Sequence, residues 1–480
     1  MTKAGQSVDF SVEPGRSAPL AWKIRVPEDF TGAITWQIFA DSKKFRDGEE
    51  STIPVVTNRM LVTETLPITV RGNQTKSFVF ENLKNAGASS SLQTQNYTLE
   101  FTSNPAWYAV QSLPYLMEFP HECSEQVFSR FYANTLASSV TEKMPQIKRV
   151  YERWKGTGAM KSNLAKNQEL KYALLEETPW VLEAKSEAEQ KKRLGLLFDL
   201  VRMGGELNTA FEKFRQLQSE NGGFVWFKGG PDNRYITQYI LTGIGHLRKL
   251  KGVAAGQEER LKAIVDKALP YLDRMIRQDY DELVKRKAKL NSYVPDPVQV
   301  QYLYLRSFFP ENRVAAASAK AYAFFRTRAQ KTWTMQNKYT QGMIALLLNR
   351  AKDAVTPRAI LRSLKETSVT HEELGRYWKD NRNGWWWYEA GVERQALLVE
   401  AFAEIEKDAA TVDELKTWLL KNKQTNKWES TRATAEACYA LLLQGSSWIQ
   451  EESSVSIRLG PLSLQSASQS AAAAAAWRPA

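Results

Sequence analysis

The spacing of hydrophobic residues changes along this chain. Residues 8–40 alternate apolar and polar positions, as in VDFSVEPG, LAWKIRVPEDFTG and ITWQIFA, with turn residues between the segments. The alternation continues through RMLVTETLPITVRGNQTKSFVFENL and ends near YTLEFTSNP. A period of two is typical of half-buried antiparallel strands. We therefore expect residues 1 to about 108 to form a β region.

From Glu122 onward the period becomes helical, as in QVFSRFYANTLASSV and KRLGLLFDLVRMGGELNTAFEKFRQL, and it stays helical to about Gly445. The segment VSIRLGPLSLQS then predicts strands again. The tail SASQSAAAAAAWRPA is of low complexity, and we assign it no function. A β segment on each side of a long helical block indicates a helical domain inserted into a β domain. Since connections in compact folds are short, the flanking strands are expected to pair with one another.

The helical block contains a repeat. Four joints begin with asparagine and lead into an apolar helix: NSYVPDPVQVQYLYLRSFF at 291, NKYTQGMIALLLNR at 337, NGWWWYEAGVERQALLVEAF at 383 and NKWESTRATAEACYALLL at 426, spaced by 46, 46 and 43 residues. NGGFVWFKGGPDNRYITQYILTGIGHL, from 221, is an earlier relative. Such a period is typical of stacked α-hairpins, arranged as an open solenoid or a closed α/α toroid. The aromatic and glycine residues at the joints, together with the resemblance described below, favour the toroid.

Length and charge exclude several classes of protein. A chain of 480 residues is too long for one ordinary core, so we expect several domains. The net charge is +12, but basic runs such as KRKAK (285–289) alternate with acidic residues. We interpret them as solvated helix faces and expect no nucleic-acid partner. No apolar run approaches the roughly 18 residues that span a bilayer, so we expect no direct membrane insertion. The first residues, MTKAGQSVDFSV, do not resemble a signal peptide.

The sequence offers little for a metal or a cofactor. Three scattered histidines and two distant cysteines give no ligand spacing, so we expect neither. TGIG at 242–245 has two glycines of a nucleotide-binding fingerprint, but it lies within a helical pattern.

Candidate chemistry is concentrated in PHECSEQVF, residues 120–128. In one interpretation, Cys123 is a small buried residue on a helix whose core face includes Val127, Phe128 and Phe131. In the other, Cys123 and Gln126 lie at i and i+3 on the first turn of a helix, where their side chains meet. The positive end of the helix dipole would lower the pKa of the thiol there. Attack of the thiolate on the Gln126 carbonyl, with loss of ammonia, would give an internal thioester.

PHECSEQVF resembles PYGCGEQ, the thioester motif of the alpha-2-macroglobulin and complement family. The order of parts is also similar: in that family a CUB-type β domain is interrupted by an α/α-toroid thioester domain, whose first helix carries the motif. The resemblance extends to ADSKKFRDGEESTIPVVTNRMLVTETLPITVRG (40–72) and NKWESTRATAEACYALL, and covers about residues 20 to 460. It implies a multi-domain protein of mixed α and β class, an α/α toroid within a CUB-type domain. The implied parts are the end of a macroglobulin-like β domain (1–40), the first part of the CUB-type domain (41–108), the toroid (109–445), and the returning CUB strands with the tail (446–480).

The resemblance also implies roles for residues. Cys123 supplies the thiol, Gln126 the acyl group, and Glu125 the acidic residue between them. Glu122 and Ser124 replace the family's two glycines, a feature found in looser bacterial motifs. His121 could orient or protonate the leaving thiol, or be an exposed structural histidine.

In the complement branch a histidine in a later hairpin takes over the acyl group. Val300 and Gln301 stand at that place here, and His246 and His371 look like helix-face residues. The resemblance then implies direct reaction of the thioester with lysine amines.

An activated acyl group must be kept away from water. The aromatic run of Trp385, Trp386, Trp387 and Tyr388 lies at a joint, where the loops of a toroid gather at one end. These residues are candidates for lining the thioester pocket. The alternative is that they are ordinary packing residues.

The resemblance implies the thioester-bearing portion of a bacterial, broad-spectrum protease inhibitor. Its partners would be attacking proteases, tethered through lysine amines, and the remaining macroglobulin domains of the full-length protein. It would react once, so it would not be an enzyme, and its expected location is the periplasm or the cell surface. One alternative is an inert α/α protein-binding module. A terpene cyclase or prenyltransferase is another, although DYDE (279–282) departs from the cyclase motif DxDD and no histidine closely follows Cys438 to complete a zinc set.

Overall fold

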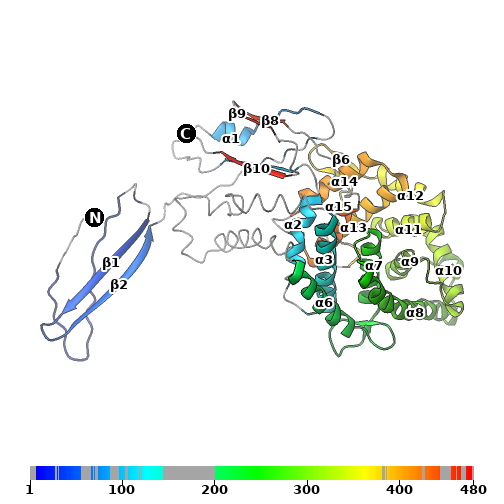
Figure 1. Ribbon diagram of the computed structural model, residues 1–480, viewed down its shortest axis with the longest axis horizontal. Coiled ribbons are helices and arrows are strands. Elements are labelled where there is room, and N and C mark those ends of the chain that lie inside the picture. Colours follow the sequence, from blue (N-terminus) through cyan, green and yellow to red (C-terminus); the bar gives the residue numbers. More distant parts are fainter. Residues whose placement is uncertain are drawn as a thin grey trace.

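The computed structural model describes residues 7–27, 30, 32–55, 66, 68, 70, 74–86, 97–102, 106–117, 119, 122–143, 200–380, 384, 386–423, 427–443, 456–460, 462–465 and 472–477. Within these residues the protein is mixed and helix-rich, with small sheets of two strands each. Figure 1 shows most helices gathered in one body, with the β1–β2 hairpin standing apart from it.

Among the described amino-terminal residues, some segments that the alternating pattern predicts as strands are not strands, and most of the predicted segment at 59–72 lies outside the described residues. β1 (Gly32–Asp41) and β2 (Arg46–Val55) form an antiparallel hairpin that spans residues 40 and 41, where the resemblance implies a domain boundary. Residues 7–27 contain no strand, and α1 (Glu81–Ala86) is a short helix where a strand was predicted. The apolar side chains of residues 7–27, such as Phe10, are exposed, except that Trp22 is partly buried. An alternating sequence forms a strand only where a neighbouring strand and a packing surface are present.

The segments before and after the helical block are joined by strand pairing. β3 (Tyr97–Thr102) pairs antiparallel with β10 (Ala472–Trp477), with Thr102 opposite Ala472. β8 (Ser456–Leu459) and β9 (Leu462–Gln465) form the predicted strands of VSIRLGPLSLQS and pair with each other. A strand before the helical block therefore does pair with a strand after it, but not with the predicted one: the partner of β3 comes from the alanine-rich tail, where we predicted no element, and the strands of VSIRLGPLSLQS pair with each other instead.

The helical block begins earlier than predicted, because α2 starts at Ala106 instead of near Glu122. No helix in the described part of the chain is both long and apolar enough to cross a membrane. The main helices are α2 (Ala106–Met117), α3 (Ser124–Lys143), α6 (Leu200–Gln216), α7 (Arg234–Lys249), α8 (Ala255–Lys285), α9 (Pro297–Arg306), α10 (Ala316–Thr332), α11 (Lys338–Arg350), α12 (Thr356–Glu366), α13 (Gly391–Ala401), α14 (Ala409–Lys421) and α15 (Thr431–Leu442). Shorter elements between them are β4 (Phe224–Val225), β5 (Asp232–Asn233), η4 (Leu290–Ser292), η5 (Trp333–Met335), β6 (Val369–His371), β7 (Gly375–Tyr377) and η6 (Phe402–Glu406).

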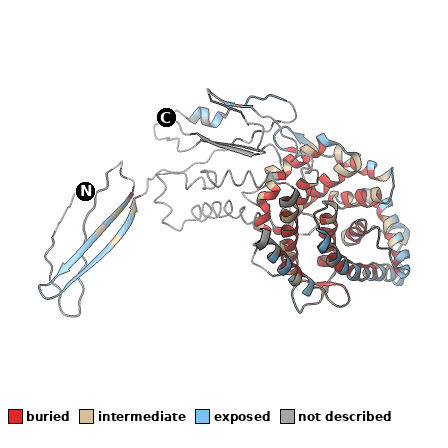
Figure 2. Ribbon diagram, viewed as in Figure 1, coloured by how far each residue is buried: buried red, intermediate tan, exposed pale blue. Residues whose placement is uncertain are grey.

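Alternate helices form an inner series. α3, α7, α9, α11, α13 and α15 contact one another in this order, and α15 in turn contacts α3. We call these the inner helices. α2, α6, α8, α10, α12 and α14 pack against them from outside. Figure 2 shows buried residues concentrated on the inner helices, while the outer helices also carry exposed residues. Every residue of α13 is buried, whereas α12 buries one stripe: Pro357, Ile360, Leu361 and Leu364.

The predicted joints lie directly before inner helices. Those from residues 221, 291, 337, 383 and 426 precede α7, α9, α11, α13 and α15 in turn. Asn337 itself caps α11, because its side chain accepts a hydrogen bond from the Thr340 N–H at 3.0 Å. Cys123 holds the equivalent place directly before α3. The joints and the Cys123 motif therefore share one position in the hairpin, at the amino-terminal end of an inner helix.

The glycines of TGIG allow close packing between inner helices. A Cβ atom on Gly243 would lie 2.4 Å from the ring of Phe128 on α3, and one on Gly245 would lie 2.5 Å from the ring of Phe308. Both distances are shorter than carbon atoms tolerate. The two glycines thus bring α7 close to its neighbours, which explains their presence in a helix.

We predict that Gly243→Ala destabilises the protein by about 1–3 kcal/mol, because the added methyl group must displace the buried Phe128 ring. Thermal and urea unfolding measure this effect. The matched control is Gly256→Ala in α8, where a Cβ would meet no atom within 4 Å. This control is expected to be neutral or stabilising, because alanine is the better helix former. Equal stabilities of the two variants would contradict the packing argument.

Candidate functional site

The first turn of α3 brings together the residues that the sequence singled out. The Cys123 carbonyl accepts hydrogen bonds from the N–H groups of Gln126 (3.0 Å) and Val127 (2.9 Å), so Cys123 starts the helix. The Cys123 side chain is partly buried. The side-chain oxygen of Gln126, Oε1, is buried and has no hydrogen-bond partner. A buried acceptor without a donor costs free energy, so it requires an explanation.

Ser124 anchors this turn to the loop before α7. Its N–H donates to the Trp226 carbonyl at 3.0 Å, and its hydroxyl donates to the Val225 carbonyl. Ser124 is completely buried. Neither Ser124 nor Glu122, both described, has a positive φ. The turn therefore forms without the two glycines of PYGCGEQ, the motif that it resembles, and the serine gains a hydrogen bond that glycine cannot make.

Glu125 connects α3 with α15. The Thr431 hydroxyl lies 3.0 Å from each Glu125 carboxylate oxygen, and the Ser129 hydroxyl donates to Oε1 at 3.0 Å. Burial raises the pKa of Glu125, although these hydrogen bonds act in the opposite direction.

Glu122 lies on the outer side of the turn. Its carboxylate is 3.2 Å from Arg130 and 3.1 Å from Lys213 on α6. Partial burial acts to raise the pKa of Glu122, but hydrogen bonds from Lys213 and Arg130 outweigh it, and the pKa is lowered. The acidic residue that replaces glycine thus pairs α3 with α6.

The predicted lowering of the Cys123 thiol pKa is wrong. Burial raises this pKa, and the nearby Glu125 carboxylate adds to the increase. Backbone N–H groups of the first turn do stabilise the thiolate, but by less than desolvation destabilises it. Whenever Cys123 is a free thiol, it is therefore protonated at neutral pH. Cys438 on α15 is fully buried, and this burial raises its pKa to about 12. Neither Cys123 nor Cys438 forms a disulfide.

Three of the predicted aromatic residues are linked to this turn through a series of ring contacts. The Trp226 ring, whose backbone anchors Ser124, stacks on Tyr235 at 6.1 Å between centroids, and Tyr235 contacts Trp387 at 5.2 Å. Trp387 in turn contacts Tyr388 at 5.5 Å. Trp386 is 56% exposed and stacks on Tyr388. Trp385 and His121 lie outside the described residues, so their predicted roles stay predictions.

The two described histidines and the residues Val300 and Gln301 lie in different surroundings. His371 lies on β6, so its assignment to a helix face is wrong. His246 is on α7 but is buried. Val300 and Gln301 are buried on α9, where the Gln301 Oε1 atom accepts a hydrogen bond from Gln238 at 2.8 Å. A local sequence pattern could not reveal these partners, because they come from neighbouring inner helices.

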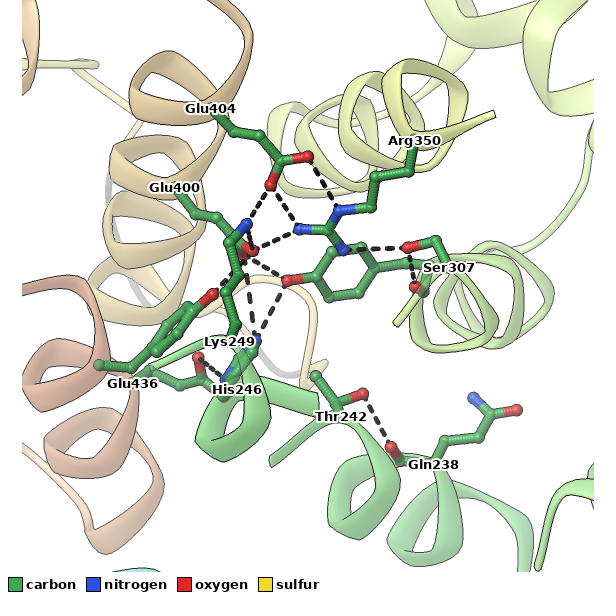
Figure 3. Close-up of polar contacts among 11 residues, drawn as sticks. Gln238, Thr242, His246, Lys249, Ser307, Arg350, Glu400, Glu404 and Glu436 are labelled. Carbon is green, nitrogen blue, oxygen red and sulfur yellow. Dashed lines mark hydrogen bonds and ion pairs between the residues drawn. The ribbon is translucent and has the colours of Figure 1, made fainter. Parts of the chain in front are cut away.

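A second cluster of polar side chains, which sequence reasoning missed, lies among the inner helices (Figure 3). Glu400 on α13 is fully buried, and its carboxylate contacts Lys249 at 2.9 Å, Tyr439 at 2.8 Å, and both Arg350 and Tyr304. Burial alone would raise the pKa of Glu400, but Lys249 and Arg350 hold it well below its usual range. Glu404 accepts further hydrogen bonds from the same two cations. Both carboxylates of this cluster are thus paired with cations, as charges in a stable interior must be.

His246 and Glu436 lie side by side in this interior. The His246 Nδ1 atom is 3.7 Å from Glu436, and its ring stacks on Tyr439 at 3.7 Å. Burial lowers the pKa of His246 to about 3 and raises that of Glu436 to about 8. Glu400 is 4.0 Å from His246, but its charge is already balanced by two cations. Both His246 and Glu436 are therefore neutral at neutral pH.

A small cavity borders this pair. It measures about 10 Å³ and is lined by Phe128, Tyr132, Tyr239, Gly243, His246, Ala435 and Glu436. This volume holds at most about one water molecule. In the described part of the chain no group of three or more histidine, cysteine, aspartate or glutamate residues is arranged to hold a metal ion. The Cys123 turn is therefore the better candidate for chemistry with an outside partner.

No family model and no curated protein matches this chain. Among solved structures, the chain is similar to native alpha-2-macroglobulin from Escherichia coli, in a crystal structure spanning domain MG7 to the C-terminus: 13% identity, TM-score 0.42, covering 79% of this chain and 48% of that one. It is also similar to the native conformation of Escherichia coli alpha-2-macroglobulin solved by cryo-EM: 14% identity, TM-score 0.42, covering 93% of this chain and 24% of that one. The chain thus spans about half the length of the first structure and a quarter of the second.

We predict that Glu436→Gln stabilises the protein increasingly as pH rises. Below the unfolded pKa of 4.5 both states are protonated. Between 4.5 and about 8 the unfolded glutamate ionises while the folded one stays neutral, so wild-type stability falls. Each pKa unit between the unfolded and folded states corresponds to about 1.4 kcal/mol in the free energy of unfolding. Glutamine does not ionise, so the variant does not lose this stability.

The measurement is the difference in Tm between variant and wild type at about pH 5 and about pH 8. The control is Glu259→Gln, at an exposed glutamate of α8. A pH-independent difference for Glu436→Gln would contradict the assignment of a buried, neutral carboxyl group.

Proposed function

We propose that the described helices form a closed α/α toroid inserted into a CUB-type β domain. The contact of α15 with α3 supports a closed arrangement. The pairing of β3 with β10 supports insertion, because it joins the chain on both sides of the helical block. In this proposal the joints and Cys123 gather at one end of the toroid.

The function that fits this site is that of the thioester-bearing portion of a protease inhibitor of the alpha-2-macroglobulin class. The observation that carries the proposal is the buried, unpartnered Oε1 of Gln126 on the same helical turn as Cys123. An amide oxygen is a strong acceptor, so burying it without a donor is costly. A thioester carbonyl is a weaker acceptor, and burying it costs less. The same burial also keeps water away from an electrophilic carbon.

The proposed bond forms without another reactant. The Cys123 sulfur attacks the side-chain carbonyl carbon of Gln126, the carbon–nitrogen bond breaks, and ammonia leaves with the thiol proton. When an amine later attacks the same carbon, an amide forms and the thiol of Cys123 is released. Each molecule reacts once, so the protein is not an enzyme in this proposal.

The raised pKa of the Cys123 thiol is consistent with a latent group. A thiolate that is destabilised by burial is a poor leaving group, so the carbon–sulfur bond resists attack while it is covered. If a conformational change exposed this turn to solvent, the destabilisation would disappear and the acyl group would become reactive. Trp226, which is partly buried beside the turn, is a candidate for the cover, with Trp387 connected to it through Tyr235.

Lysine amines are the acceptors that we propose. Val300 and Gln301 occupy the position of the acceptor histidine in the complement branch, and Gln301 is already bound by Gln238. Direct aminolysis would tether an attacking protease through its surface lysines. The other partners in this proposal are further macroglobulin domains of a longer protein, and its location is the periplasm or the cell surface.

We predict that the purified wild-type protein is roughly 17 Da lighter than its sequence mass, because forming the thioester releases ammonia. Treatment with methylamine should add one amine at Gln126 and release one thiol at Cys123. Intact and peptide mass spectrometry measure both changes.

The matched control is Cys123→Ser, which should have its full sequence mass and take up no methylamine. Cys438→Ser should behave like the wild type. A wild-type protein with its full mass, a free Cys123 thiol and an unchanged Gln126 would instead favour an inert protein-binding module.

A further inference from the structure

Thr431, the first residue of α15, makes a buried contact with the reactive turn. Its hydroxyl lies 3.0 Å from both carboxylate oxygens of Glu125, although the two residues are 306 positions apart. Thr431 is only 6% exposed. A hydrogen bond between a hydroxyl and a carboxylate is stronger than one between neutral groups, more so in a buried site.

The start of α15 is itself held in place. The Ser430 side chain caps this helix by accepting a hydrogen bond from the Ala433 N–H at 3.0 Å. Arg432 donates to the Trp387 carbonyl at 3.1 Å and lies 3.6 Å from the Glu393 carboxylate. Thr431 therefore projects from a fixed helix end, so it can restrain the residue that it contacts.

The first turn of α3 is held from two sides. Ser124 is bound to Val225 and Trp226 before α7, and Glu125 is bound to Thr431 on α15. These two residues lie between Cys123 and Gln126. By fixing Ser124 and Glu125, these contacts also orient Cys123 and Gln126 on either side.

We propose that Thr431 is a positioning residue for the Cys123–Gln126 turn: by holding Glu125, it keeps the thiol and the carboxamide in their mutual orientation once α15 has docked on α3. The proposal deepens the proposed function and rests on it, since it names a residue that prepares that site. Docking of the last helix would then be required before the turn reaches its final form.

The test compares four full-length proteins, all carrying Gln126→Ala so that no thioester can form. They are the parent, Thr431→Val, Thr431→Ser and Thr135→Val. Thr135 on α3 is the matched control, because it is also a buried threonine, but its hydroxyl donates only to the Phe131 carbonyl, at 2.9 Å. The measurement is the rate of alkylation by iodoacetamide at Cys123 and at Cys438, followed by peptide mass spectrometry.

Cys438 distinguishes local loosening from unfolding, since it is fully buried on the same helix as Thr431. We expect Thr431→Val to be alkylated several-fold faster at Cys123, with Cys438 unchanged. Thr431→Ser, which keeps the hydroxyl, should match the parent, and so should Thr135→Val. If Thr431→Val does not fold, Thr431→Ala replaces it, because alanine also removes the hydroxyl and favours the helix.

Three outcomes would overturn the positioning role. They are unchanged Cys123 alkylation in the variant that lacks the hydroxyl, equal acceleration at both cysteines, and failure of Thr431→Ser to restore the parental rate. The three threonine substitutions are also made in the protein that keeps Gln126. There, Thr431→Val should lower the fraction of molecules that bind methylamine, whereas Thr431→Ser and Thr135→Val should leave it unchanged. A wild-type protein that contains no thioester would contradict the proposed function. The alkylation experiment would still show whether Thr431 holds the turn, because it uses proteins in which no thioester can form.

Discussion

The structure depends on the burial of its inner helices from all sides. α13 has no exposed residue, and α7 is buried from Ile236 to Leu247. A helix that exposes no face to water is stable only when neighbours surround it and pair its buried polar groups. Each inner helix contacts the next, and the contact of α15 with α3 supplies the last missing neighbour. The hairpins are therefore not independent units, and their stability is collective.

This constraint places two very different polar sites among the inner helices. In the cluster around Glu400, cations and hydroxyl groups satisfy the buried carboxylate, so the cluster fastens several helices together. At the first turn of α3, the Gln126 Oε1 atom is buried without a donor. The first site is satisfied within the protein, whereas the second contains a buried acceptor that the described residues leave without a donor.

The same low-dielectric interior explains the pKa changes at both sites. Burial disfavours whichever form is charged, so it raises the pKa of Cys123 and Glu436 and lowers that of His246. Glu400 is the exception, because two cations compensate for its burial. At the Cys123 turn, burial outweighs the helix end, which is why an expectation based on helix position alone had the wrong sign.

The sequence alone determined the helical block, the joints before α7, α9, α11, α13 and α15, and the place of Cys123 at the start of α3. These features depend on local periodicity and on turn and capping residues, which act over a few positions. Tertiary structure decided the rest. It left the alternating residues 7–27 without a strand partner, and it paired the alanine-rich β10 with β3. It also placed Thr431 against Glu125 and buried His246 beside Glu436. Such contacts join residues far apart in the chain, and they follow from which helices become neighbours, a property that no local pattern encodes.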